Sequence, residues 1–161
     1  MVAQLSPAAR HGTGPLAGLM RDGALHCVFQ PLADLREGSV YAHEALIRGP
    51  QGGPWHAPDA LLAQARTEGV LQDFELFCVF TALEQWSAQA TPGRLFVNIS
   101  ADALVHGVSM VGMAKLGEAV RSCGLNARML VLEITEHERV TNMPLLREAI
   151  DAVHACGARM A

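Results

Sequence analysis

Two short apolar runs, residues 95–100 and 129–135, constrain the fold of this chain more than any other feature. Each has the length of a buried strand and carries a polar side chain near its end. Residues 158–161 begin a further strand. Helical periodicity separates and flanks these runs at residues 72–90, 110–123 and 142–156. Strands that alternate with helices predict βαβ units and a parallel sheet with both faces covered.

The N-terminal third predicts a different arrangement. Residues 25–32 and 40–48 have strand character, and the polar turn at residues 36–39 joins them. Two adjacent strands with a short turn form an antiparallel hairpin. We expect Pro31 to interrupt the first strand at its end, and a short helix over residues 16–20 to precede the hairpin.

The segments that follow the hairpin and the first apolar run predict a loop and two helical pieces. Residues 49–58 are rich in glycine and proline, which favours an exposed loop. Pro58 suits the first turn of a helix that ends at Gly69. After residue 100, Ser100 or Asp102 can cap a short helical turn.

Composition narrows the class of protein. The chain has 161 residues, 17% of them charged, and a net charge of −4. This size fits one domain, and the charge argues against a disordered chain or a protein that binds nucleic acid polymers. We interpret residues 1–14 as a flexible leader and residues 15–161 as the domain. No apolar stretch approaches the length of a membrane helix.

The four cysteines lie far apart, with no C-x-x-C pair. This spacing argues against a cysteine metal site and favours reduced, buried thiols in a cytoplasmic protein. The cysteines are Cys27, Cys78, Cys123 and Cys156.

Residues 43–48 hold the first candidate for chemistry. In a strand, Glu44, Leu46 and Arg48 share one face, because side chains alternate between the two faces. A carboxylate on a buried face must be neutralised, so a metal or an ion pair is expected nearby. The alternative is a Glu44–Arg48 pair on a solvated face.

Glu44, Asn98 and Glu133 all fall at or near the carboxyl ends of predicted strands. In parallel α/β proteins these ends face the ligand. Two carboxylates and an amide oxygen are hard donors, suited to Mg²⁺, Mn²⁺ or Ca²⁺. A strand-end acid can equally be a cap or an ion-pair partner, and this alternative stays open.

Four motifs occur together across residues 16–161. They are Phe29-Gln30-Pro31-Leu32-Ala33-Asp34-Leu35, Glu44-Ala45-Leu46-Ile47-Arg48-Gly49, Phe96-Val97-Asn98-Ile99-Ser100 and Leu132-Glu133-Ile134-Thr135-Glu136. Their order and approximate spacing are those seen in the EAL domain, so the chain resembles the bacterial cyclic di-GMP phosphodiesterases named after the Glu-Ala-Leu motif.

The resemblance implies a (β/α)₈ TIM-like barrel whose first strand is antiparallel, here incomplete, with about five strands present. It implies Mg²⁺ or Mn²⁺ as cofactor and cyclic di-GMP as ligand. Its metal ligands match Glu44, Asn98 and Glu133, its dinucleotide contacts match Gln30, Leu46 and Arg48, and a possible supporting acid matches Glu136.

One departure from the family limits the expected activity. After residues 157–161 the family continues with Leu-Asp-Asp-Phe-Gly, whose paired aspartates complete a two-metal site. We therefore expect a truncated domain, inactive alone, that self-associates through the exposed half-barrel. The alternatives are a non-catalytic interaction or dimerisation module, or a cyclic di-GMP binder without turnover.

Overall fold

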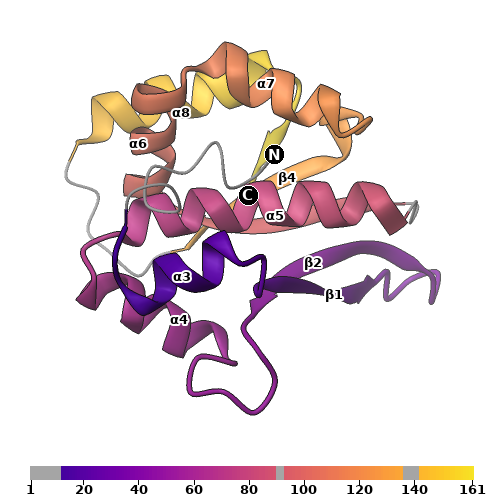
Figure 1. Cartoon of the computed structure of the whole chain (residues 1–161). Coiled ribbons are helices and arrows are strands. Elements are labelled where there is room, and N and C mark those ends of the chain that lie inside the picture. The colour runs from indigo at the N-terminus through magenta and orange to yellow at the C-terminus, as the bar shows by residue number, and fades with distance from the viewer. Residues whose placement is uncertain (1–11, 90–92, 136–141) are drawn as a thin grey trace.

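The strands of the computed structural model form one five-stranded sheet in chain order, β1-β2-β3-β4-β5 (Figure 1). The structure describes residues 12–89, 93–135 and 142–161. β1 and β2 are antiparallel, and the other neighbours are parallel, so the predicted hairpin and parallel sheet are confirmed. The strands are β1 His26–Ala33, β2 Val40–Arg48, β3 Arg94–Ser100, β4 Leu130–Thr135 and β5 Arg159–Met160.

The helices lie on both sides of a long central helix, α5, which crosses the sheet (Figure 1). In that view α3 and α4 lie below α5, and α6, α7 and α8 lie above it. None of the described helices is long and apolar enough to cross a membrane. The helices are α3 Pro15–Arg21, α4 Pro58–Thr67, α5 Leu71–Gln89, α6 Ala101–Val111, α7 Met113–Ser122, the 3₁₀ turn η1 Ala127–Met129 and α8 Met143–Ala155.

The hydrophobic core lies between the helices and one face of the sheet, called here the helix face. All but one of the alternate residues of β3 and β4 are at most 3% exposed there, and they pack with apolar side chains of α5, α6 and α8. The strand residues at this level of burial are Leu95, Val97, Ile99, Leu130 and Leu132. Alternation along β1 and β2 adds Cys27 and Ala45 to the same core.

The opposite face, called here the open face, does not join this core in the described residues. Ala42 and Val131 are buried but lie outside the core cluster. The prediction that both faces are covered is therefore wrong for the described part of the chain. The five strands there also form an open sheet with β1 and β5 at its edges, rather than a closed barrel.

β2 and β3 separate toward their carboxyl ends. Their pairing runs from Ala42–Arg94 to Ala45–Val97 and stops there. β3 and β4, in contrast, pair as far as Ser100–Thr135. The last three residues of β2 thus pair with β1 alone.

The segment from residue 101 to residue 123 differs from the prediction. A helix was expected over residues 110–123 after a short capped turn, but α6 already begins at Ala101 and fills that turn. Gly112, at φ 75°, ends α6 before α7 begins, a backbone conformation that favours glycine. Ser100 is the cap, and it accepts a hydrogen bond from the backbone N–H of Ala103 at 3.1 Å.

Two further predictions need correction. Pro31 lies inside β1 and does not interrupt it, because β1 is an edge strand and tolerates a missing N–H. All four cysteines are free, as predicted, but only Cys27 is buried. Cys78, Cys123 and Cys156 are partly exposed.

Candidate functional site

The open face of the hairpin carries the first group of candidate residues. Gln30 of β1 is paired in register with Glu44 of β2, and Val28 with Leu46. Directly paired residues of an antiparallel sheet point to the same face. Gln30, Glu44 and Leu46 therefore share the open face, as does Arg48 by alternation.

Asn98 joins this group from β3. Its side-chain amide nitrogen donates a hydrogen bond to a carboxylate oxygen of Glu44 at 2.7 Å. Asn98 is also the register partner of Glu133 in β4, which puts Glu133 on the same face. The structure thus brings together the three predicted metal ligands, and each of them is half-buried.

The two charge arrangements predicted for Glu44 can now be compared. No Glu44–Arg48 ion pair is present among the residues the structure describes. Arg48 donates instead to the backbone carbonyl of Ile47 at 2.9 Å. The partner of the Glu44 carboxylate is the Asn98 amide, which leaves the amide oxygen of Asn98 as a potential metal donor.

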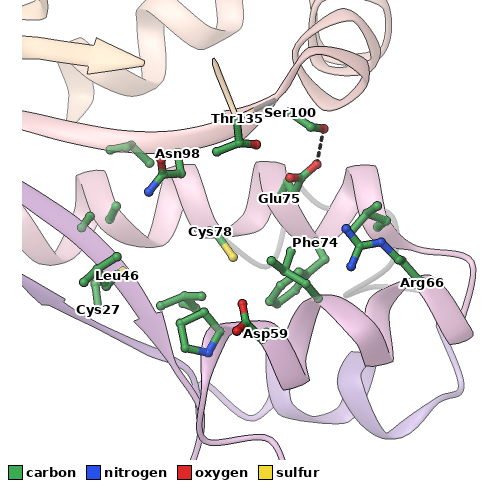
Figure 2. A pocket seen from close by; sticks show the side chains of 17 residues that line it. Cys27, Leu46, Asp59, Arg66, Phe74, Glu75, Cys78, Asn98, Ser100 and Thr135 are labelled. Carbon is green, nitrogen blue, oxygen red and sulfur yellow. Dashed lines mark hydrogen bonds between the residues drawn. The ribbon is translucent and has the colours of Figure 1, made fainter. Parts of the chain in front are cut away.

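A cavity of about 320 Å³ opens where β2 and β3 separate (Figure 2). It lies between the sheet and helices α4 and α5, and Asn98 and Leu46 border it on the sheet side. The volume is at the lower end of the range for small-molecule sites. Its other walls include Pro58, Phe74, Glu75 and Cys78.

Glu75 and Ser100 also line this cavity, and the sequence did not predict a role for them there. The Ser100 hydroxyl donates a hydrogen bond to the Glu75 carboxylate, which ties the end of β3 to the first turns of α5 (Figure 2). Ser100 is also the cap of α6, so one hydroxyl joins three elements. The available signal was a single acid between apolar residues, Phe74 and Leu76, on a predicted buried helix.

Two thiols also line the cavity. Burial raises the pKa of Cys27 from 9.0 to about 12, although the positive charge of Arg48 opposes the shift. Although Cys78 is partly exposed, desolvation by the side chains packed around its thiol raises its pKa well above 9.0, and a negative charge on Cys27 or Glu75 would add to this effect. Both thiols therefore stay protonated at neutral pH, as poor nucleophiles and poor metal ligands.

The donors on the open face suit a hard divalent cation. Glu44, Asn98 and Glu133 supply only oxygen donors of the kind that Mg²⁺, Mn²⁺ and Ca²⁺ prefer. Within residues 12–89, 93–135 and 142–161, no group of three or more His, Cys, Asp or Glu side chains could hold a metal ion. Glu136, the possible supporting acid, lies outside the described residues.

Comparisons of the sequence find known relatives of this chain. Residues 16–161 match the sequence model of the EAL domain. The probable cyclic di-GMP phosphodiesterase PdeB of Escherichia coli is 28% identical over 141 residues, which cover 83% of this chain. The chain spans 26% of the length of that curated relative.

Solved structures show the same fold. Klebsiella pneumoniae BlrP1, in a complex with manganese and cyclic di-GMP, has a TM-score of 0.71 and 24% identity, over 85% of this chain and 34% of that one. The EAL domain of Xanthomonas citri FimX, in complex with cyclic di-GMP, has a TM-score of 0.74 and 18% identity, over 90% of this chain and 56% of that one. At these identities the likeness describes the fold, α/β and similar to a TIM barrel, here with a sheet that is not closed.

Proposed function

Since this chain belongs to the EAL domain family, we propose that it supplies the first part of a metal-dependent site for cyclic di-GMP hydrolysis. The observation that carries the proposal is the 2.7 Å bond between Asn98 and Glu44, with Glu133 in register beside Asn98. These contacts gather three oxygen donors on one face, next to Gln30, Leu46 and Arg48.

Each residue has a distinct role in the proposed site. The carboxylates of Glu44 and Glu133 and the amide oxygen of Asn98 would hold the cation, Mg²⁺ or Mn²⁺. A bound divalent cation polarises a phosphoryl oxygen and lowers the pKa of an attacking water. The guanidinium of Arg48 pairs with a phosphate, and the Gln30 amide hydrogen-bonds the dinucleotide.

The cavity between β2 and β3 provides a place for one base of the dinucleotide. Leu46 and Phe74 offer apolar walls to a planar ring. The edge of guanine presents N–H donors, and Glu75 in the cavity wall presents a carboxylate that accepts them. This chemistry supports guanine as the base that enters.

We further propose that the 161-residue chain binds the dinucleotide without hydrolysing it. Two-metal phosphodiester chemistry uses a larger set of ligands than two carboxylates and an amide. The described residues offer no group of three acids, histidines or cysteines to complete such a set. The four free cysteines fit a cytoplasmic setting for this binding.

Calorimetry with cyclic di-GMP in the presence and absence of Ca²⁺ tests the proposal. We expect metal-enhanced binding, and we expect Glu44→Gln to weaken it by at least about tenfold, since an amide replaces a charged ligand. Glu37→Gln, in the exposed turn between β1 and β2, is the matched control and should bind as the parent does. A folded chain that gives no heat at high micromolar ligand would favour the alternative, a non-catalytic interaction module.

A further inference from the structure

The loop between β2 and α4 is closed at its base by two reciprocal hydrogen bonds. The backbone N–H of Gly49 donates to the carbonyl of His56 at 3.1 Å. The Nδ1 atom of His56 lies 3.1 Å from the carbonyl of Gly49, which is an acceptor, so Nδ1 carries the proton of this bond. Together the two bonds clip residues 49 and 56 to each other.

The packing at the clip is tight. Gly49 is buried, and a Cβ atom at this position would lie 2.1 Å from the backbone oxygen of Trp55. Trp55 itself packs against the hydrophobic core. Gly53 adds an inner turn through its N–H bond to Pro50 at 3.1 Å. The base of the loop therefore has little freedom to move relative to the core.

Arg48 immediately precedes this clip. It is the last residue of β2, beyond the point where β2 pairs with β3, so β3 does not hold its backbone. β1 pairs with it only through His26, at the start of that strand. The clip is the constraint that follows Arg48 directly along the chain. Figure 1 shows the loop projecting away from the end of β2 before α4 begins.

We propose that His56 is a positioning residue for Arg48: through its bond to Gly49 it fixes the direction in which Arg48 leaves β2 toward the phosphate. This inference rests on the proposed function, because it assigns a consequence to the Arg48–phosphate contact. His56 itself does not touch the dinucleotide. Its contribution passes through the backbone of residue 49.

Affinity measurements on three single variants of the whole chain test the inference. We expect His56→Ala to weaken cyclic di-GMP binding by about two- to tenfold, the range for one lost hydrogen bond. His56→Asn should restore most of the affinity, because its amide N–H can donate to the Gly49 carbonyl from the same place. Gln51→Ala, an exposed residue of the same loop, is the matched control and should change nothing.

A double-mutant cycle separates positioning from a general structural role. If His56 acts through Arg48, His56→Ala should have no further effect on affinity in an Arg48→Ala background. Equal losses in both backgrounds, or no rescue by asparagine, would overturn the inference while the proposed function stands. If the parent chain does not bind cyclic di-GMP, the proposed function fails first and this inference with it.

Discussion

The two faces of the sheet are built on opposite principles. On the helix face, the alternate residues of β3 and β4 are apolar, and all of them except Ile134 are at most 3% exposed. On the open face, the same strands present Phe96, Asn98 and Glu133, all of them half-buried. Val28 on β1 is 40% exposed. Tyr41, at the register shift of β2, is 46% exposed, and its ring centre lies 6.5 Å from that of Phe96.

The contacts on the open face are polar and aromatic. The guanidinium of Arg94 lies 4.8 Å from the centre of the Tyr41 ring and hydrogen-bonds its hydroxyl. Beyond these residues, toward the carboxyl ends, the Asn98–Glu44 bond follows. The comparison teaches that stability comes from one face of these strands and that the other face is free to carry chemistry.

The largest change in stability is expected from a mutation that leaves a cavity on the helix face. Leu132 is 1% exposed, so Leu132→Ala should lower the free energy of unfolding by about 2–5 kcal/mol. Its neighbour Glu133 points to the open face, and Glu133→Gln should change that free energy by less than about 0.5 kcal/mol. Denaturant unfolding measures both. Similar losses for the two variants would break the comparison.

A smaller loss of unfolding free energy is expected at Ser100, which joins the end of β3 to helices α5 and α6. Ser100 caps α6 and hydrogen-bonds Glu75, so Ser100→Ala should cost about 1 kcal/mol of unfolding free energy. Ser109→Ala, an exposed serine on the same helix, is the matched control. A loss at Ser109 equal to that at Ser100 would contradict the assigned role of the cap.

The smallest change in unfolding free energy is expected at alkaline pH, from the thiol of Cys27 in the cavity wall. The folded-state pKa of Cys27 is raised from 9.0 to about 12, so its stabilising effect is full below pH 9 and is lost as pH rises toward 12. By pH 9.5 the unfolding free energy should have fallen by about 0.8 kcal/mol through this thiol alone. Denaturant titrations of the parent and Cys27→Ala should differ by this slope. Parallel pH profiles would show that the thiol is not shielded.

Most of the fold could be predicted from the sequence because local signals and packing agree. The alternation of apolar strands with helices predicted the parallel sheet, and the polar turn after β1 predicted the hairpin. The errors occurred where context overrides propensity. Pro31 was expected to interrupt β1, but it lies on an edge strand, where a proline is tolerated. Ser100 was predicted to cap only a short turn, whereas it caps the whole of helix α6.

The candidate site was predicted in part. Asn98 and Glu133 stand near the ends of β3 and β4, where polar residues after apolar runs are visible in a sequence, whereas Glu44 lies in the middle of β2. The Glu75–Ser100 bond could not be seen because it depends on how α5 packs against β3, and the His56–Gly49 clip could not be seen because it depends on the conformation of an irregular loop. A sequence pattern reports which face a residue takes, whereas such contacts depend on how the elements pack.

Because the pairing between β2 and β3 ends early, the site consists of two parts of the sheet. Only four register pairs connect the β1–β2 hairpin to β3. The hairpin carries Gln30, Glu44 and Arg48. The pair of strands β3 and β4 carries Asn98 and Glu133. The Glu44–Asn98 hydrogen bond thus connects the two parts beyond the point where their backbones stop pairing. A ligand held by residues of both parts would therefore bridge a part of the sheet that only four register pairs and the Glu44–Asn98 bond otherwise connect.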